Sequence, residues 1–214
     1  MSKDLSNYRK SYEKSELLLE DVPNNPLQLF QKWFSEVDTS DHIDEANAMT
    51  ISTIGLDGFP KSRVVLLKKY SEDGFIFYTN YNSEKGNAIA HNDKVCLSFF
   101  WASAERQVII KGKAKKVSNA VSDEYFNTRP RGSKLGAHVS NQSSITKKND
   151  LENKLVALET YYKEKDIPRP KHWGGYIVKP IEIEFWQGRP NRLHDRIRYK
   201  INEDLSWLID RLAP

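Results

Sequence analysis

The spacing of hydrophobic residues predicts a helix in the first 45 residues, after an acidic leader. Asn25 can cap this helix, and Pro26 suits its first turn, where a backbone N–H would have no partner. Apolar residues follow at intervals of three or four, which places them on one helical face. They are Leu27, Phe30, Phe34 and Val37.

From residue 46 the hydrophobic period changes to two, which is typical of strands with one buried face. The clearest alternation runs over residues 107–115, where Gln107 and three lysines share the polar face. Turn sequences that contain Asp-Gly separate the early strands. We expect further strands at 48–54, 62–69, 75–79, 95–101, 181–185, 192–199 and 205–212, and helices at 83–91, 118–128 and 150–165.

The order of these elements indicates the fold class. Strands joined by short turns, with helices between groups of strands, favour an antiparallel β-barrel over a doubly wound parallel sheet. No internal repeat, low-complexity tract or Gly/Ser-rich linker divides the 214 residues. The sequence therefore predicts one mainly β domain, a barrel with flanking helices.

Composition excludes disordered and membrane-embedded proteins, because 38% of the residues are hydrophobic and 29% are charged. The longest uncharged apolar-rich run, residues 95–104, is about half of the roughly 20 residues that a bilayer-spanning helix needs. The N-terminus lacks the apolar core of a signal peptide. A single cysteine, Cys96, cannot form an intrachain disulfide. We expect a cytoplasmic protein.

The net charge of +4 is too small to indicate a nucleic-acid binder, but the charge is unevenly distributed. Residues 1–45 contain 5 basic and 10 acidic side chains, whereas residues 46–170 contain 20 and 13. The middle of the chain is therefore expected to attract anions.

Most familiar catalytic signatures are missing. The chain has no GxGxxG, GxxxxGK[ST], GxSxG or HExxH sequence. Its histidines are too scattered to predict a metal site, so we expect none. They are His42, His91, His138, His172 and His194.

One predicted strand near the C-terminus gathers cationic side chains. In residues 192–199, alternation places Arg192, His194, Arg196 and Arg198 on one face. A solvated strand face is the ordinary interpretation of such a run. Crowded like charges are unfavourable unless an anion or an electron-rich ring lies opposite, which favours a bound anionic cofactor.

Two other basic stretches suit phosphate. Residues 63–68 place Arg63 and Lys68 near the two ends of an apolar strand and on opposite faces. Residues 125–133 combine two guanidiniums, a phenol and a hydroxyl before a short helix, which are suitable donors for a phosphate group. A plain surface loop explains the second stretch equally well.

Several motifs occur together in one order: RVVLLK, YTN, ERQ, YFNTRPRGS, QSS, HWGG, EFWQGRPNRLHDR and the terminal RLAP. With them the chain closely resembles the pyridoxine (pyridoxamine) 5′-phosphate oxidase family, from about Tyr8 to Pro214. The resemblance implies a mobile segment at 1–20 and a split-barrel FMN-binding domain at 21–214. It also implies a homodimer with FMN between the subunits, and no nucleic-acid or membrane partner.

The resemblance further implies the reaction. The enzyme would oxidise pyridoxamine or pyridoxine 5′-phosphate to pyridoxal 5′-phosphate with dioxygen, releasing hydrogen peroxide, and ammonia from the amine. Arg192, His194 and Arg196 would be the catalytic residues. The FMN contacts would be Arg63, Val64, Val65, Leu66, Leu67, Lys68, Tyr78, Thr79, Lys85, Gln107, Gln142, Ser143, Trp186 and Arg196.

The substrate contacts come from three parts of the chain. Some would hold the phosphate, others the pyridine ring, and two would come from the N-terminal segment as it closes over the substrate. They are Lys68, Tyr125, Arg129 and Ser133 for the phosphate, Arg192, Leu193 and His194 for the ring, and Arg9 and Tyr12 for the segment.

This sequence departs from the family pattern at Glu84, where many members have a basic residue before the lysine that matches Lys85. A charge-assisted hydrogen bond contributes roughly 1.5 to 3 kcal/mol. We therefore expect FMN to bind more weakly here, by about one to two decades, unless Glu84 points away.

Three alternatives remain. The first is another split-barrel flavin reductase, or an FMN-binding protein without oxidase activity. The second is a barrel that binds single-stranded nucleic acid through Lys111, Lys113 and Lys115, but the lysine face has no aromatic residue for stacking. The third, a barrel without ligand, would leave the cationic strand unexplained.

Overall fold

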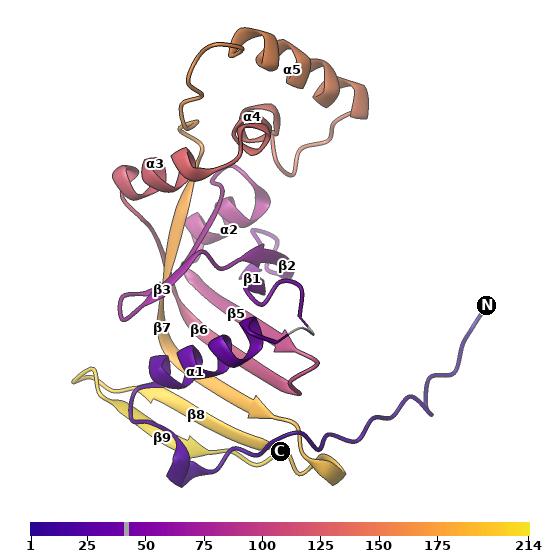
Figure 1. The fold of residues 1–214 in the computed structure, drawn as a ribbon, viewed down its shortest axis with the longest axis vertical. Coiled ribbons are helices and arrows are strands. Elements are labelled where there is room, and N and C mark those ends of the chain that lie inside the picture. The colour runs from indigo at the N-terminus through magenta and orange to yellow at the C-terminus, as the bar shows by residue number, and fades with distance from the viewer. Residues whose placement is uncertain (41–42) are drawn as a thin grey trace. The chain divides into compact units, whose positions relative to one another are not determined.

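We describe a computed structural model of the chain, in which residues 1–40 and 43–214 are described (Figure 1). Its helices are α1 (Pro26–Asp38), α2 (Glu84–His91), α3 (Asn119–Thr128), α4 (Arg131–Val139) and α5 (Lys148–Tyr161), with short 3₁₀ turns η1 (Leu19–Asp21) and η2 (Pro190–Arg192). Its strands are β1 (Ala48–Ile54), β2 (Pro60–Leu66), β3 (Lys69–Ser71), β4 (Gly74–Asn80), β5 (Lys94–Trp101), β6 (Arg106–Lys116), β7 (Trp173–Gln187), β8 (Asp195–Ile201) and β9 (Trp207–Arg211).

In the described residues the strands form one sheet in the order β2-β1-β5-β6-β7-β4-β3, and β8 and β9 extend it from β7. The pairs β3–β4, β4–β7, β7–β8 and β8–β9 are antiparallel. The chain divides into two compact units. Unit 1 comprises residues 1–49, 97–111 and 180–214, and unit 2 comprises residues 50–96 and 112–179.

The core of unit 1 is aromatic. Phe30 on α1 contacts Phe99 on β5, with ring centroids 5.3 Å apart, and Trp33 contacts Phe185 on β7 at 5.3 Å. The buried ring of Tyr199 packs on Phe185, and its hydroxyl donates to Pro23 O at 2.8 Å. Aromatic rings bury a large apolar area in such edge-to-face pairs, so these contacts fix α1 on the strands.

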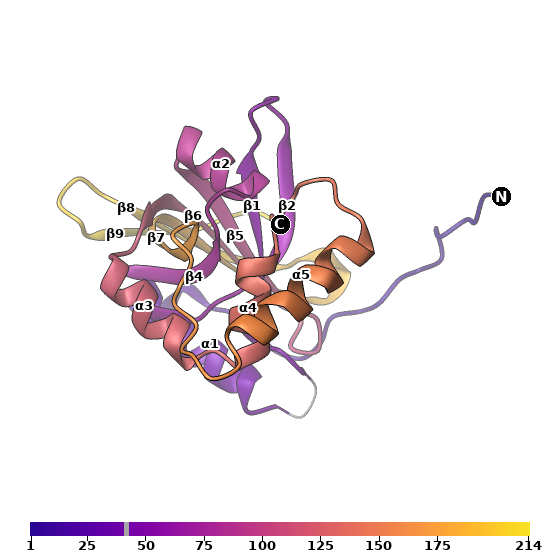
Figure 2. The same cartoon turned by 90° about the horizontal axis from the view of Figure 1, so that it is seen from above.

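In unit 2, β4 is buried on both faces and α3, α4 and α5 lie close together (Figures 1 and 2). Two glycines of β7 make room for tyrosines near β4. A Cβ atom at Gly175 would lie 2.8 Å from the Tyr78 ring, and one at Gly174 would lie 2.2 Å from Tyr81 Oη. The two glycines of HWGG face opposite sides of the strand, so they leave room for one tyrosine side chain on each side.

The predicted helices and most strands are confirmed. The Asn25 side chain accepts a hydrogen bond from Leu27 N at 2.9 Å, and the buried face of α1 includes Leu29 and Trp33 in addition to the expected Phe30 and Val37. Burial alternates along β6 as predicted. None of the helices in the described part of the chain has the length and hydropathy that a membrane-spanning segment requires.

Two strand predictions are wrong in their bounds. The expected strand at 62–69 breaks after Leu66, because Lys68 N already donates to Ile76 O of β4 at 2.8 Å and β3 starts at Lys69. The expected strand at 181–185 is the end of a 15-residue strand, β7. The single domain over 21–214 and the mobile segment at 1–20 remain predictions.

A third correction concerns the predicted cationic strand face at 192–199. Strand β8 starts only at Asp195, because Asn191 and Arg192 adopt positive φ angles of 58° and 64° in the η2 turn. Arg192 and His194 are therefore not part of the strand, and the shared face reduces to Arg196 and Arg198.

Candidate functional site

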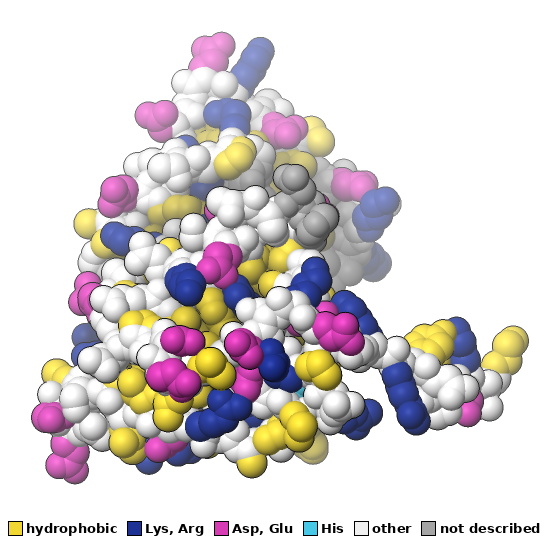
Figure 3. Space-filling view, turned by 60° about the horizontal axis from the view of Figure 1, so that its bottom comes forward, with side chains coloured by type: hydrophobic (Ala, Val, Ile, Leu, Met, Phe, Trp, Pro, Cys, Tyr) yellow, Lys and Arg dark blue, Asp and Glu magenta, His cyan; other side chains and the backbone are white. Residues whose placement is uncertain are grey.

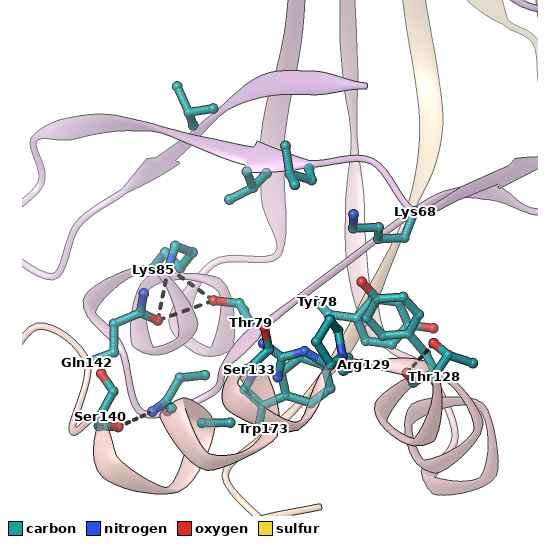
Figure 4. Close-up of a pocket in the computed structure, with 18 residues that line it drawn as sticks. Lys68, Tyr78, Thr79, Lys85, Thr128, Arg129, Ser133, Ser140, Gln142 and Trp173 are labelled. Atoms are coloured by element: carbon teal, nitrogen blue, oxygen red, sulfur yellow. Dashed lines mark hydrogen bonds between the residues drawn. The ribbon is translucent and has the colours of Figure 1, made fainter. Parts of the chain in front are cut away.

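Unit 2 contains a cavity of about 660 Å³ between β2, β4, α2 and the α3–α4 region (Figure 4). Its walls combine apolar strand residues with lysine, arginine, hydroxyl and aromatic side chains. It is lined by Val64, Val65, Leu66, Lys68, Tyr78, Thr79, Asn80, Lys85, Tyr125, Thr128, Arg129, Pro130, Ser133, Gly136, Ala137, Ser140, Gln142 and Trp173.

Lys85 provides a buried positive charge at one end of this cavity. It lies in the first turn of α2, where Ser83 caps the helix, and the residue is only 7% exposed. Its Nζ donates to Thr79 Oγ1 at 3.0 Å and to Gln142 Oε1 at 3.3 Å, both of which are neutral oxygens. Burial, reinforced by Arg63, lowers the pKa of Lys85 to about 8. An anion here would relieve an unfavourable charge.

Arg63 and Glu84 lie beside Lys85. The Arg63 guanidinium donates to Thr53 Oγ1 at 2.6 Å and to Lys61 O at 2.7 Å, and burial lowers the pKa of Arg63. Glu84 does not line the cavity, and its Oε2 lies 2.6 Å from Lys61 Nζ. Glu84, the residue that departs from the family pattern, therefore forms an ion pair with an exposed lysine of β2, and its charge still opposes the lowering of the pKa of Lys85 and Arg63 by burial.

The other end of the cavity is aromatic and contains Arg129. The rings of Tyr78, Tyr125 and Trp173 are nearly parallel, with Tyr78 and Tyr125 centroids 3.9 Å apart. The Arg129 guanidinium lies 4.5 Å from the Trp173 ring centroid, and its buried Nη1 has no hydrogen-bond partner among the residues that the structure describes. Burial lowers the pKa of Arg129. A buried guanidinium nitrogen without an acceptor suits an anionic ligand.

Lys68 and Ser133 also line this cavity. Lys68 is exposed and follows the end of β2, so the strand break that the sequence did not predict determines where this lysine lies. Ser133 lies in the first turn of α4, the short helix that follows the basic loop. The cluster predicted for a substrate phosphate, which is Lys68, Tyr125, Arg129 and Ser133, is thus brought together in one cavity.

The loop after α4 brings two predicted FMN contacts to α2. Gln142 lines the cavity and accepts from Lys85. Ser143 has a positive φ of 74°, and its Oγ accepts from Glu84 N at 3.2 Å. Of the predicted FMN residues in unit 2, Arg63, Leu67 and Ser143 are not part of the cavity wall, and Leu67 is buried.

The remaining predicted residues belong to unit 1, where three rings form a cluster. Trp186 lies 4.8 Å from His194 and 5.6 Å from Tyr12, measured between ring centroids. The Tyr12 ring rests on Gly188, where a Cβ atom would approach it to 2.7 Å. Arg189 N donates to His194 Nδ1 at 3.1 Å, so the proton of the neutral imidazole lies on Nε2.

Two buried carboxylates fix the N-terminal segment on unit 1. Glu105 Oε2 accepts from Glu13 N at 2.8 Å and from Lys14 N at 3.0 Å. Asp195 Oδ2 accepts from Leu17 N at 3.0 Å, and Asp195 also pairs with Arg189 and Arg211. Sequence reasoning missed both acids.

Arg196 and Arg198 are paired within unit 1. Arg196 Nε donates to Glu184 Oε1 at 2.8 Å, and Arg198 Nη2 donates to Asp210 Oδ2 at 2.6 Å. The argument that these cations require a bound anion is therefore wrong, because neighbouring strands supply the carboxylates. Basic and acidic side chains also lie side by side over much of the face in Figure 3.

The last predicted residues are Arg9, Leu193 and Gln107, which are not part of the cavity wall. Arg9 is exposed, and its Nε donates to Ser6 O at 3.3 Å, while Leu193 is 68% exposed. Gln107 lies on β6. Within the described residues no group of histidine, cysteine and acidic side chains could hold a metal ion, and His42 lies outside them.

Sequence reasoning also missed cavity residues. The cavity wall also includes Trp173, Asn80, Thr128 and Ser140. In the sequence, HWGG contributes only to the family resemblance and does not by itself predict a cavity residue. A large aromatic residue followed by two glycines at the start of a strand could have indicated that Trp173 lines a cavity.

Two family models match the chain. The model described as pyridoxamine 5′-phosphate oxidase matches residues 38–161, and the model described as pyridoxine 5′-phosphate oxidase C-terminal dimerisation region matches residues 173–214.

The chain is also similar to proteins named pyridoxine/pyridoxamine 5′-phosphate oxidase. The Flavobacterium psychrophilum protein is 66% identical over 213 residues, which cover 99% of this chain and 100% of that protein. The Flavobacterium johnsoniae protein is 65% identical over 211 residues, which cover 98% and 99%.

Solved structures confirm the fold. PhzG from Burkholderia lata 383, in complex with tetrahydrophenazine-1-carboxylic acid, matches with a TM-score of 0.86 and 25% identity, covering 94% of this chain and 100% of that one. An FMN-binding protein from Nostoc punctiforme, described as related to pyridoxamine 5′-phosphate oxidase, matches with a TM-score of 0.70 and 12% identity, covering 87% and 96%. The fold is the predicted one, an antiparallel split barrel with flanking helices, and the chain belongs to the pyridoxine/pyridoxamine 5′-phosphate oxidase family.

Proposed function

We propose that this chain is an FMN-dependent oxidase that converts pyridoxamine or pyridoxine 5′-phosphate to pyridoxal 5′-phosphate. Dioxygen is the final acceptor, and hydrogen peroxide is released, with ammonia from the amine. One observation carries the proposal. The cavity contains two cationic groups, the buried Lys85 and the half-buried Arg129 with its buried Nη1, and neither forms an ion pair within the described residues (Figure 4). Cofactor and substrate are both phosphate esters, so two separate positive groups suit the pair.

The Lys85 end fits the FMN phosphate. Its buried ammonium contacts only neutral oxygens and lies beside Arg63, so a dianion would gain two charge-assisted interactions. Thr79, Gln142 and Ser143 add polar groups nearby. Val64, Val65 and Leu66 form an apolar wall for a flat ring. When bound, FMN would accept a hydride from the substrate and pass the electrons to dioxygen.

The Arg129 end fits the substrate phosphate. Arg129 Nη1 has no hydrogen-bond partner among the described residues, and Lys68, Tyr125 and Ser133 line the same cavity. These groups would hold the phosphate and so orient the carbon that is oxidised.

The unit 1 residues complete the site from a second copy of the chain. Gln107, Trp186, Arg192, His194 and Arg196 are absent from the cavity wall. A homodimer that places the partner's residues at this cavity accounts for their absence from the wall, and the match of residues 173–214 to a dimerisation region supports it.

His194 and Arg192 would bind and orient the substrate ring. Because His194 Nδ1 accepts from Arg189 N, the neutral imidazole presents a donor at Nε2 rather than a base. Arg192, held in a left-handed conformation, would assist proton removal by stabilising negative charge. Arg9 and Tyr12 would close over the substrate, and the amides of residues 13, 14 and 17, which Glu105 and Asp195 hold, would be the fixed end of the moving segment.

The alternative is a flavin reductase or FMN-binding protein of the same fold. Such a protein has no use for the second cationic group at Arg129. The test is to purify the protein with FMN, add pyridoxamine 5′-phosphate without oxygen, and follow flavin absorbance. Bleaching, followed by peroxide when air is admitted, is expected. A flavin that stays yellow would exclude the oxidase.

A further inference from the structure

The position of Arg129 depends on aromatic contacts rather than on a carboxylate. Its guanidinium carbon lies 4.5 Å from the Trp173 ring centroid and 5.6 Å from that of Phe126. Nη1 is buried and has no partner, and Arg129 forms no ion pair within the described residues. A guanidinium in this state is held mainly by cation–π attraction, which strengthens when the cation is desolvated.

Trp173 is itself fixed rigidly. The residue is 7% exposed and lies at the start of β7, paired with Asn80 of β4. Its carbonyl accepts from Arg169 Nη1 at 2.6 Å, and Arg169 Nε in turn bonds Asp123 Oδ1 at 2.6 Å. The Phe126 ring meets the indole edge-to-face at 5.2 Å. The indole therefore has little freedom to follow a moving side chain.

The same indole orients a second group of the site. Its ring plane lies within 8° of the Tyr125 plane and within 10° of the Tyr78 plane. Tyr125 and Arg129, which come from one turn at the end of α3, are thus aligned by one ring of β7. Both line the cavity, as Ser133 does.

We propose that Trp173 is a positioning residue for the substrate phosphate, acting through Arg129. The inference rests on the proposed function. With the indole in place, the Arg129 N–H groups are ordered before the ligand arrives, so binding does not have to order them. Without the indole, the Arg129 guanidinium is free to rotate toward water. Ligand binding must then order this side chain, which reduces the affinity for the ligand.

The test measures ligand binding by calorimetry on FMN-saturated protein, not turnover. The ligands are pyridoxal 5′-phosphate and pyridoxal, which lacks the phosphate. Because pyridoxal in water is mainly its cyclic hemiacetal, the affinity of each ligand is compared only between protein variants. Trp173→Leu should weaken pyridoxal 5′-phosphate about 5- to 30-fold, the range of a desolvated cation–π contact. It should leave pyridoxal within about twofold, and Trp173→Phe should restore most of the loss.

A double-mutant cycle separates positioning from general structural damage. In an Arg129→Ala background, Trp173→Leu should cause no further loss of pyridoxal 5′-phosphate affinity, because the group through which it acts is gone. Additive losses, or equal losses for both ligands, would overturn the inference.

A second measurement applies even where Trp173→Leu does not fold. Site-specific replacement of Trp173 by tryptophans with one to four ring fluorines keeps the shape and weakens the π face stepwise. The logarithm of the dissociation constant of pyridoxal 5′-phosphate should rise with each fluorine, and that of pyridoxal should not. A dissociation constant of pyridoxal 5′-phosphate that does not change with the number of fluorines contradicts the inference.

These outcomes are distinct from failure of the proposed function. If the unmodified protein neither binds pyridoxal 5′-phosphate nor bleaches with pyridoxamine 5′-phosphate, the proposed function fails. If it does both while the cycle is additive and the fluorine series is flat, only the role of Trp173 fails.

Discussion

The ring of Tyr12 lies directly on Gly188, where any Cβ atom would come within 2.7 Å of the ring. Gly188→Ala should therefore push Tyr12 away from Trp186 and loosen residues 9–17, since the backbone at 188 does not itself require glycine. We expect faster trypsin cleavage after Lys14 and a higher KM for pyridoxamine 5′-phosphate.

A matched control for this variant is Gly132→Ala. A Cβ atom there meets nothing within 4 Å, so cleavage after Lys14 should not change. Equal cleavage rates in Gly188→Ala and the unmodified protein would show that Tyr12 does not depend on Gly188.

Lys85 should make FMN binding depend on pH. Burial and Arg63 lower the pKa of Lys85 to about 8, so in the free protein the ammonium is charged below pH 8 and loses its proton above it. A phosphate dianion prefers the charged form, so affinity is present below pH 8 and falls as pH rises through it. The dissociation constant, followed by quenching of FMN fluorescence, should rise up to about tenfold per pH unit above 8.

Lys85→Arg is the control for this pH dependence, because a guanidinium stays charged throughout the range. Its FMN dissociation constant should be flat between about pH 7 and 9. If the FMN dissociation constant of Lys85→Arg rises with pH as steeply as that of the unmodified protein, a group other than Lys85 causes the pH dependence.

Glu84 is expected to weaken FMN binding less than the sequence alone suggested. The carboxylate lies 2.6 Å from Lys61 Nζ, and both side chains are about half exposed, so water and salt screen them. Glu84→Arg should tighten FMN by less than about fivefold. Lys61→Ala, which leaves Glu84 unpaired, should weaken it by a similar factor. A change of two decades in either variant would show that Glu84 acts directly on the cofactor.

His194 should contribute to turnover as a donor from Nε2. His194→Ala is expected to lower kcat at saturating substrate by about tenfold or more. His194→Gln should retain more activity, because the glutamine amide can also donate. Arg192→Ala should lower kcat as well. Turnover equal to that of the unmodified protein in both alanine variants would exclude a role in the chemical step.

The sequence predicts much of the fold because hydrophobic periodicity reflects burial directly. The α1 start at Pro26 and the alternation along β6 follow from local side-chain chemistry. The break after Leu66 does not, because the apolar run continues to Leu67 and only the bond from Lys68 N to Ile76 O reveals it.

In the candidate site too, the sequence predicts local features but not those that depend on contacts with distant parts of the chain. Residue types in the basic loop at 125–133 predict donors for a phosphate group, but only the family resemblance selects Arg129 over Arg131. The state of Arg196 and Arg198 depends on strand register, which brings Glu184 and Asp210 beside them across β7 and β9. Register is a long-range property, so spacing along one strand could not show that these charges are compensated.

The two acids beneath the N-terminal segment bind main-chain amides, at Glu13, Lys14 and Leu17. These contacts do not depend on which side chains residues 13, 14 and 17 carry. They depend on the number of residues between the amides that Glu105 and Asp195 bind. Point substitutions at 13 and 14 should be tolerated, whereas inserting or deleting a single residue there would shift Tyr12 out of place. Chain length, more than sequence, is what this stretch must preserve.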